Sequence, residues 1–399
     1  MLSFSQHKAL VTEQTVQNKH LDHLEDLMIL QGKEGLELSI AFMKDIGQSL
    51  RTGSTTLGIS TKWDGKPAVV CGINPENKKF FVATKSAFNK EVKAFHTPAE
   101  IKKGVPSADL ASKLTQCLKY LSKIGITGVL QGDLMFTSDS KKSQDIKGKK
   151  YITFMPNTIM YAVGADSPMG KAIASAKVGI AFHTAYSGNS MSSLSAATFN
   201  FNASKLKKTA DVWFTDPNVY DITPALMKPD EYGVLEKIIK DCEAKAKTVA
   251  PFLKILLSNT ALMEFVSPYI NSTINGGMAQ FSARGLKQFV ETKIGKEMEK
   301  LKTEKGKQGK QATMDKLTGF VDAYSKQIDD MFALHNSLSN GKELLLNKFY
   351  AISQFGHFFV DEEGIRPTDP EGMVISRAGQ VVKLVNRLRF SRQNRKVNA

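Results

Sequence analysis

The spacing of apolar side chains predicts two helices in the first third of the chain. Residues 34–51 carry Leu36, Ile40 and Met43 along one side of a helix, and residues 97–124 carry four leucines at intervals of three or four positions. Residues 20–28 also alternate polar and apolar positions at helical spacing, which predicts a short amphipathic helix.

Short apolar runs bounded by turn residues predict strands in two parts of the chain. The strands of the first part are expected at 57–61, 68–73, 80–84, 126–136, 151–154, 158–164 and 177–185. The polar, lysine-rich residues 137–150 predict a loop between them. The strand pattern returns near the end of the chain, around 370–376 and 380–386.

Between the two strand-rich parts, the pattern is almost purely helical. Apolar stripes predict helices near 231–258, 279–302, 312–340 and 342–354. We therefore predict an α+β fold in which a large all-α domain, residues 225–350, is inserted into a sheet-containing core. The two parts of this core are residues 55–224 and 351–399, and residues 1–54 form an N-terminal helical segment.

The net charge indicates a polyanionic partner. The 399 residues carry a formal charge of +15 at pH 7, and such a surplus of Lys and Arg favours nucleic acid as the partner. Two strongly basic stretches, 293–310 and the tail 387–396, are predicted to contact phosphate backbones. The alternative for 293–310 is an ordinary solvated helix end and loop.

The sequence predicts neither a membrane protein nor a secreted one. No long apolar span, lipid-anchor motif or signal peptide is visible. Cys71, Cys117 and Cys242 lie far apart and form no CxxC pair, which disfavours both a disulfide framework and a zinc site. We therefore expect a cytoplasmic protein.

The motif with the clearest chemical meaning is Lys62-Trp63-Asp64-Gly65. It lies between two predicted strands, so we expect a hairpin whose turn is at Asp64-Gly65. A lysine at the mouth of such a hairpin is held on rigid backbone. Read alone, the motif only turns the chain and leaves Lys62 as a solvated flank. Trp63 either faces a substrate or is a buried structural ring.

Other polar residues allow more than one interpretation. Asp133 lies in an apolar run, where a carboxylate is costly unless it is paired, hydrogen-bonded or bound to a metal. Lys85 belongs either to a loop that binds phosphate or ribose or to a solvated loop. We interpret His183 as a structural residue of its strand. A plain helix is favoured over a metal site for His20, His23 and Asp26, because no further ligands are visible nearby.

Together with two later segments, these residues resemble the motifs of the covalent nucleotidyltransferases, the superfamily of ATP-dependent RNA and DNA ligases and mRNA capping enzymes. Lys62-Trp63-Asp64-Gly65 is similar to the KxDG motif, and Gly132-Asp133 is similar to a later Gly-Glu motif. The other matching segments are Glu371-Gly372-Met373-Val374 for EGxV, Val382-Lys383-Leu384 for the terminal lysine motif, and Thr84-Lys85-Ser86 for a short basic segment. The resemblance implies a nucleotidyltransferase core of the ATP-grasp-like ligase type, built from antiparallel sheets.

The resemblance also implies a role for each matching residue. Lys62 would attack the α-phosphorus of ATP, forming lysyl-AMP and releasing pyrophosphate, and Lys383 would neutralise charge on the α-phosphate. Glu371 would hold Mg²⁺ or Mn²⁺, with Asp133 and Asp64 as further candidate ligands. The nucleotide site implied in this way comprises Lys62, Asp64, Gly65, Lys66, Lys85, Asp133, Glu371 and Lys383.

Several positions depart from the family pattern. Asp133 replaces the usual Glu, Lys66 stands where another residue usually meets the ribose or phosphate, and the terminal motif has one lysine, Lys383. Asp133 and Glu371 are 238 positions apart, which requires a large insertion. The 16 residues after Lys383 leave no room for a C-terminal OB-fold.

We therefore predict an enzyme most like the phage-type RNA ligases, which would join 5′-phosphate and 3′-hydroxyl ends of RNA in the cytoplasm, or in the host cytoplasm if it is phage-encoded. Two alternatives stay open. A DNA ligase would use the same chemistry on another substrate. A non-catalytic protein that binds nucleic acid or nucleotide, including a phage structural or packaging-associated protein, would keep the fold without the full chemistry.

Overall fold

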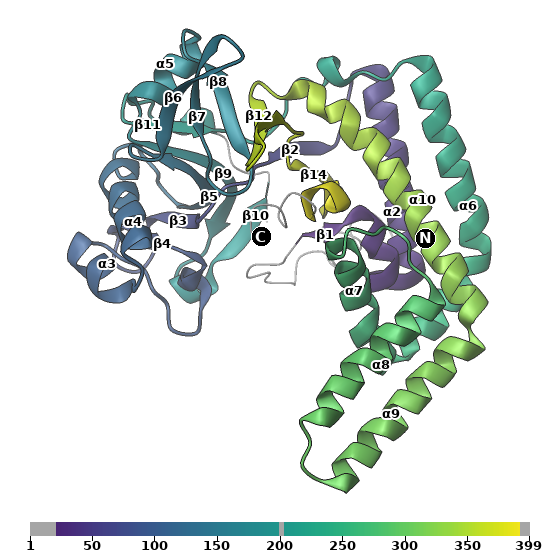
Figure 1. The fold of residues 1–399 in the computed structure, drawn as a ribbon. Coiled ribbons are helices and arrows are strands. Elements are labelled where there is room, and N and C mark those ends of the chain that lie inside the picture. Colours follow the sequence, from purple (N-terminus) through teal and green to yellow (C-terminus); the bar gives the residue numbers. More distant parts are fainter. Residues whose placement is uncertain (1–20, 199–202, 392–399) are drawn as a thin grey trace. The chain divides into compact units, whose positions relative to one another are not determined.

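The computed structural model describes residues 21–198 and 203–391, which fold into two compact units (Figure 1). Apart from N-terminal residues, the first unit consists of Gly58–Tyr220 and Ser353–Gln380. The second unit consists of Asp22–Leu57, Asp221–Ile352 and the residues from Val381 onward. Helices contain 51% of the residues and strands contain 23%, so the fold is mixed α+β.

The centre of the first unit is a six-stranded sheet in the order β10-β9-β5-β3-β4, with β11 also paired to β9. Its strands are β3 (Ala68–Ile73), β4 (Phe80–Ala83), β5 (Val129–Thr137), β9 (Val178–Ser187), β10 (Ser195–Thr198) and β11 (Val212–Thr215). The central strand β3 is a continuous apolar run because both of its faces are covered. Val69 and Cys71 lie in one core with residues of α4 (Ala108–Leu121), and Val70 lies in another core with Phe81.

A second sheet of the first unit has the order β13-β12-β8-β7-β6. Its strands are β6 (Lys141–Ile146), β7 (Lys149–Phe154), β8 (Met160–Gly164), β12 (Gly356–Asp361) and β13 (Gly364–Pro367). The prediction of a loop over 137–150 is therefore wrong. β6 lies at the edge of the sheet, where the exposed Lys142 discourages pairing with another chain. Most of its residues are exposed or half-buried, so no buried face produces an alternating apolar pattern.

The predicted hairpin at Asp64-Gly65 is also wrong. The strand before it, β2 (Gly58–Lys62), pairs with β14 (Gly372–Arg377), so β2 and β3 lie in different sheets. The linker pairs with β5 instead: Lys66 N donates to Leu134 O at 3.2 Å, and Leu134 N donates to Pro67 O at 3.0 Å. Since β4 and β5 flank β3 on both sides, β3 has no open edge for β2.

Short helices complete the first unit. α3 (Pro98–Gly104), α4 and α5 (Pro168–Ser175) begin after Thr97, Ser107 and Ser167, and each of these side chains accepts a hydrogen bond from a first-turn backbone N–H. The 3₁₀ turns of the unit are η2 (Lys85–Phe88), η3 (Met191–Ser193) and η4 (Ala203–Lys205).

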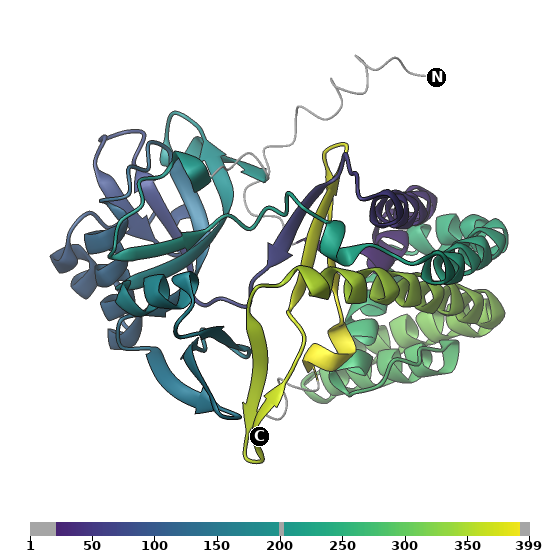
Figure 2. The ribbon, with the colours of Figure 1, turned by 90° about the horizontal axis from the view of Figure 1, so that it is seen from above.

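The second unit is mainly helical. Its helices are α2 (Leu27–Thr52), α6 (Pro229–Ser258), α7 (Thr260–Asn275), α8 (Ala283–Glu299), α9 (Glu304–Ala323) and α10 (Ser325–Phe349), with the 3₁₀ turns η1 (Leu24–Asp26), η5 (Thr223–Ala225) and η6 (Tyr350–Ile352). Helices α2, α6 and α10 lie side by side, and α8 and α9 form an antiparallel hairpin (Figures 1 and 2). The unit also contains a parallel pair of short strands, β1 (Asp22–His23) with β15 (Gln380–Val385).

Two helix predictions in this unit need correction. The helix predicted over 20–28 forms only in part, because residues 22–23 form β1, residues 24–26 form the 3₁₀ turn η1, and α2 starts at Leu27. Tertiary contacts override the helical spacing here, since the carboxylates of Glu25 and Asp26 bind charged groups from α10 and the C-terminal region. The boundary between α9 and α10 falls at Tyr324, earlier than predicted. His20 lies outside the described residues.

Candidate active site

Lys62 and Glu371 are brought together by the pairing of β2 with β14. Lys62 lies opposite Gly372 in this antiparallel ladder, so Glu371 stands directly before the paired residues. Lys62 Nζ donates a hydrogen bond to Glu371 Oε1. The Lys62 side chain is 29% exposed, whereas that of Glu371 is only 10% exposed. The amine is therefore partly open to solvent, while its partner is shielded from water.

The surroundings of Glu371 disfavour its ionised form. Burial raises its pKa to about 7, although the neighbouring Lys62 ammonium acts in the opposite direction, and the charges of Asp64 and Asp133 add to the rise. Its second oxygen, Oε2, is buried and has no hydrogen-bond partner among the residues that the structure describes. An unpaired buried carboxylate oxygen is costly, so this atom suits a cation or a proton.

Asp64 fixes the linker between β2 and β3. Its Oδ1 accepts a hydrogen bond from Asn157 Nδ2 at 2.7 Å, and its Oδ2 accepts bonds from the backbone N–H groups of Thr158 and Ile159 at 2.7 and 2.8 Å. Its own backbone N–H donates to the Tyr161 hydroxyl at 2.8 Å. Asp64 is buried, and these bonds tie the residues after Lys62 to the β7–β8 connection. Asp64 therefore orients the Lys62-Trp63-Asp64-Gly65 motif.

Gly65 allows the linker to approach Asp133 closely. A Cβ atom at position 65 would lie 2.4 Å from the Cβ of Asp133, a distance that real side chains do not adopt. Asp133 is partly exposed, and its charge contributes to the raised pKa of Glu371. The first unit therefore gathers Lys62, Asp64, Gly65, Asp133 and Glu371 around one linker.

Trp63 packs as a structural ring. Its centroid lies 5.4 Å from that of Tyr161, 5.5 Å from that of Phe355 and 6.3 Å from that of Trp213. Its indole Nε1 is buried and unpaired within the described part of the chain. Because Trp63 points into this aromatic cluster, its neighbour Lys62 is anchored from a second side.

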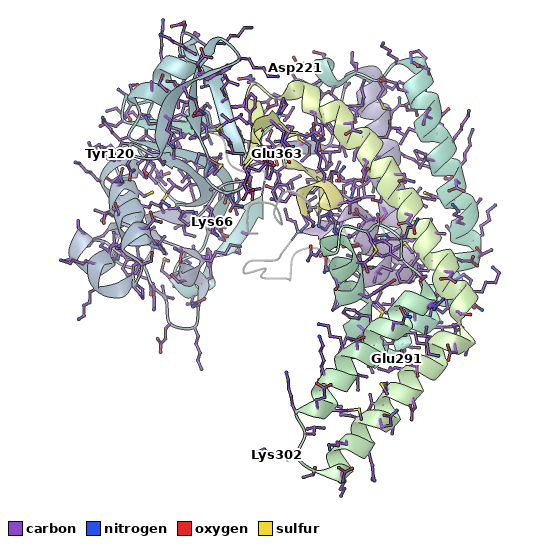
Figure 3. All side chains as sticks on the ribbon, in the orientation of Figure 1. Lys66, Tyr120, Asp221, Glu291, Lys302 and Glu363 are labelled. Carbon is purple, nitrogen blue, oxygen red and sulfur yellow. The ribbon has the colours of Figure 1, made fainter. Side chains whose placement is uncertain are left out.

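The other predicted nucleotide-binding lysines occupy different positions. Lys66 is exposed on the linker (Figure 3). Lys85 is exposed at the first position of η2, and the preceding Thr84 hydroxyl accepts a hydrogen bond from the backbone N–H of Ser86. Lys383 belongs to the second unit, where it lies opposite His23 in the β1–β15 pair.

The predicted basic tail is only partly described. Arg387 is 10% exposed, and its Nη1 donates to both oxygens of Asp26 at 3.0 and 2.9 Å. Its charge is thus engaged within the second unit. Residues 392–396 of the predicted contact surface lie outside the described residues.

The sequence did not reveal a buried charge cluster in the second unit. Lys342 Nζ donates to Glu25 Oε1 at 2.6 Å, with both side chains at most 2% exposed. His335 Nε2 lies 2.8 Å from Asp26 Oδ1. Burial alone would raise the pKa of Glu25, but the Lys342 ammonium holds it below the usual value. In the sequence, the sign of this buried cluster is a pair of acidic residues between two leucines, Leu24-Glu25-Asp26-Leu27.

His183, which the sequence predicts to be a structural residue of its strand, lies beside Asp133. Its Nε2 is 3.8 Å from Asp133 Oδ1.

No group of three or more His, Cys, Asp or Glu side chains is arranged to hold a metal ion in the described ranges 21–198 and 203–391.

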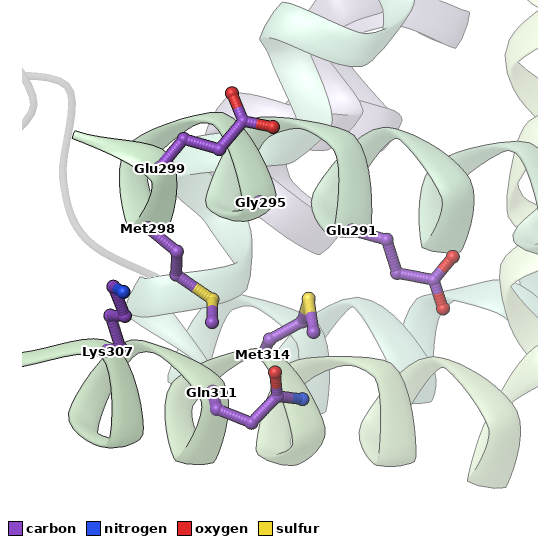
Figure 4. A pocket seen from close by; sticks show the side chains of 7 residues that line it. All are labelled: Glu291, Gly295, Met298, Glu299, Lys307, Gln311 and Met314. Atoms are coloured by element: carbon purple, nitrogen blue, oxygen red, sulfur yellow. The ribbon is translucent and has the colours of Figure 1, made fainter. Parts of the chain in front are cut away.

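The second unit contains a hollow of about 540 Å³ between α8 and α9 (Figure 4). Its lining includes Met298, Met314, Glu291 and Gln311. Within the described residues, no single helix is long and apolar enough to span a membrane; α6 and α7 pass that test only as a pair bent by 115°.

Comparison with known proteins places the chain in a family without assigning a function. Neither the curated proteins nor the solved structures include a significant match. One family model matches residues 18–398, which is nearly the whole chain. The chain therefore belongs to DUF6267, a family of unknown function.

Proposed function

We propose that this protein is an ATP-dependent polynucleotide ligase, with RNA as the favoured substrate, and that it forms lysyl-AMP at Lys62. The observation that carries the proposal is the contact between the Lys62 amine and the buried Glu371 carboxylate. The two residues lie in motifs that resemble KxDG and EGxV, and the strand pairing of β2 with β14 joins these distant motifs.

The first step needs a neutral amine at Lys62. A lysine attacks phosphorus only after losing a proton, and a base in hydrogen-bond contact can accept it. Glu371 Oε1 is such a base, and its pKa of about 7 suits proton exchange near neutral pH. In the proposed step, Glu371 accepts one proton from the Lys62 ammonium and the neutral amine forms the Nζ–phosphorus bond. The bond from the α-phosphorus to pyrophosphate breaks, and the second proton of the amine leaves with the pyrophosphate.

Later steps would transfer AMP from Lys62 to a polynucleotide 5′-phosphate and then join this end to a 3′-hydroxyl. In the last step, the hydroxyl oxygen bonds to the 5′-phosphorus and AMP leaves. Lys66 and Lys85, both exposed, would contribute positive charge for the phosphates.

The carboxylates fit a magnesium ion. Mg²⁺ is usually bound by one or two carboxylates together with waters and phosphate oxygens, so a cluster of three acids is not required. Asp133, which is partly exposed, would hold it, and Glu371 Oε2, which has no hydrogen-bond partner among the described residues, would join it as long as Glu371 is ionised, before this residue accepts the proton. When bound, the ion would neutralise phosphate charge. Asp64, whose oxygens already accept three hydrogen bonds, would orient the lysine.

The α8–α9 hairpin is the proposed contact for the nucleic-acid backbone. Lys300, Lys302 and Lys305 are exposed and form no ion pair within the described part of the chain, with Lys302 at the hairpin tip (Figure 3). By contrast, Lys307 and Lys310 are already paired with Glu304 and Glu297. The three free charges are therefore the ones available for phosphates.

Labelling with ATP tests the enzymatic proposal. The protein is incubated with α-labelled ATP and Mg²⁺, denatured, and examined for label on the chain. Wild type and Lys79→Ala, which removes an exposed lysine from a turn, should be labelled, whereas Lys62→Ala and Lys62→Arg should not. Lys62→Arg keeps a positive charge beside Glu371, so its loss of label would reflect the missing nucleophile.

An unlabelled wild type that is folded, and that mass spectrometry shows to carry no AMP, would refute the ligase. Binding of nucleotide or polynucleotide without labelling would then favour the second candidate, a non-catalytic binding protein. That candidate is supported by Asp133 in place of Glu and by the single lysine at position 383. If labelling occurs, sealing assays with nicked RNA and nicked DNA distinguish the two ligase substrates.

A further inference from the structure

A two-residue turn joins β6 to β7. Ile146 pairs with Lys149 across the two strands, so only Lys147 and Gly148 lie between them. Their φ angles are +53° and +78°, and two positive values are characteristic of a type I′ turn. Gly148 adopts this conformation easily, and its N–H donates to Asp145 Oδ1 at 2.7 Å. Side chains rarely adopt a positive φ, and Asn is the residue that this turn prefers, so the local fold gives no reason for a lysine at position 147.

The turn presents positive charge that the protein leaves unpaired. Lys147, Lys149 and Lys150, the tip lysines, are exposed, and none of them forms an ion pair in the described part of the chain. Asp145 is the only acidic residue in 141–154, and its Oδ1 is bound by the backbone of the turn. Like charges so close together repel one another and destabilise the folded state, and a bound polyanion would relieve this repulsion.

Lys141 fixes the other end of β6. Its Nζ donates to the backbone oxygens of Ile173, Ala174 and Ala176, at 2.7, 2.9 and 2.5 Å, where α5 ends. A cation suits this place, because a helix carries partial negative charge at its C-terminus. Lys141 is thus used within the fold. The tip lysines, by contrast, stand on a strand pair that is anchored before any partner binds, which lowers the entropic cost of binding.

Strand β7 connects the tip lysines to the surroundings of Lys62. Lys149 begins the strand and Phe154 ends it, which corresponds to a length of about 17 Å. The connection that follows supplies Asn157, whose Nδ2 donates to Asp64 Oδ1 at 2.7 Å. Asp64 stands two residues after Lys62. The tip lysines and the linker of Lys62 therefore lie near opposite ends of β7, within the first unit.

A nucleic-acid backbone is the partner that fits these charges. No large apolar side chain is exposed in residues 141–150, all of which the structure describes, whereas a segment that lies on a membrane buries apolar groups in it. One strand of a duplex advances about 3.4 Å per phosphate, so the length of β7 corresponds to about five nucleotides.

We propose that the tip lysines bind the sugar-phosphate backbone of the polynucleotide, whatever its sequence, about five nucleotides from the end that reacts at Lys62. This inference rests on the proposed function, and it names the part of the substrate that the first unit holds. The contact is separate from that of the α8–α9 hairpin, which belongs to the second unit.

The length of the bound strand tests the proposal. Fluorescence anisotropy measures the affinity of the full-length protein for 5′-phosphorylated RNA and DNA strands of four and twelve nucleotides over a salt series. The tip variant, Lys147→Asn/Lys149→Gln/Lys150→Gln, removes three charges and places at position 147 the residue that a type I′ turn prefers. Its unfolding temperature should be no lower than that of wild type, which separates a loss of binding from a loss of fold.

A control variant, Lys102→Gln/Lys103→Gln/Lys119→Gln, removes three exposed lysines from α3 and α4 of the same unit. We expect the tip variant to bind the long strands about tenfold more weakly, with a slope of log affinity against log salt that falls by about 2. The control variant should stay within about twofold of wild type, since it changes only the long-range attraction. The short strands should lose no more than about twofold in either variant, because they cannot reach from Lys62 to the tip lysines.

Equal losses in the two variants would overturn the inference in favour of net charge. Equal losses of short and long strands, or a tip variant that binds the long strands like wild type, would also overturn it. ATP labelling of Lys62 does not involve the tip lysines, so a labelled wild type with any of these results keeps the ligase and loses the inference alone. An unlabelled, folded wild type whose tip variant still loses the long strands would overturn the ligase and support the polynucleotide surface.

Discussion

At the scale of single residues, the raised pKa of Glu371 predicts how stability depends on pH. The folded protein holds this proton up to a pH of about 7, whereas the unfolded chain releases it near 4.5. Its contribution is therefore fully present below pH 4.5 and is lost as pH rises through 7. The loss amounts to about 3 kcal/mol. Glu371→Gln, which is neutral at every pH, should gain up to that amount relative to wild type between pH 4.5 and 8, as measured by urea unfolding.

The control for this prediction is Glu362→Gln, the same chemical change at an exposed carboxyl group. Its stability should parallel that of wild type over the whole pH range. At pH 8, added Mg²⁺ should stabilise wild type and Glu362→Gln but not Glu371→Gln, because only the ionised Glu371 carboxylate would bind the ion. Parallel unfolding curves for Glu371→Gln and wild type would contradict the assigned environment of Glu371.

The same residues indicate what the sequence could and could not reveal about the site. Lys62, Glu371 and Asp133 were found because their side chains and their order form readable motifs. The hydrogen bonds of Asp64 were not predictable, since Asn157 to Ile159 lie more than ninety positions away. The place of His183 beside Asp133 was not predictable either, because it depends on a bulge, and strand alternation gives no sign of one.

At the scale of elements, the buried pair of Lys342 and Glu25 joins α10 to the 3₁₀ turn η1. Removing one partner of a buried ion pair leaves an uncompensated charge, and this typically costs about 3–5 kcal/mol. Lys342→Met should therefore destabilise the protein by about that amount, whereas Lys342→Met with Glu25→Gln should recover most of the loss. Chemical unfolding followed by circular dichroism at 222 nm measures both, since the second unit is mainly helical.

A suitable comparison is Lys44→Met, which removes the lysine of an exposed pair with Glu243. Exposed pairs contribute little, so this change should cost less than about 1 kcal/mol. If Lys342→Met cost no more than Lys44→Met, the buried pair would not stabilise the contact between α10 and η1. If the double variant were as unstable as the single one, the loss would come from packing around Lys342.

The elements themselves were predictable wherever one face or one stripe is buried. The apolar run of β3 and the leucine stripe of α4 indicated their structures correctly, because both bury these residues in one core. The pattern failed at the edge strand β6, which has little buried surface. At β2 it indicated the strand but not its partner, because β14 follows more than three hundred positions later. Strand partners separated by an inserted helical segment leave no local signal.

At the scale of the whole molecule, the charge of +15 raises the question of where a polyanion binds. Reversing the three free charges of the α8–α9 hairpin, in Lys300→Glu/Lys302→Glu/Lys305→Glu, should weaken polynucleotide binding at least tenfold at low salt. Each phosphate contact on a single strand contributes about 0.7 to the slope of log affinity against log salt, so this slope should fall by about 2. Fluorescence anisotropy with labelled RNA and DNA over a salt series measures both quantities.

A matched triple variant separates contact from net charge. Lys237→Glu/Lys240→Glu/Lys247→Glu makes the same change on the exposed surface of α6 and lowers the net charge equally. If binding depends on contacts at the hairpin, the α6 variant keeps the salt slope of wild type and loses affinity only through weaker long-range attraction. Equal losses in both variants would mean that the total charge, and not the hairpin, governs binding. A hairpin variant that binds like wild type at low and moderate salt would assign the polynucleotide to another surface and leave the hairpin lysines as a solvated helix end.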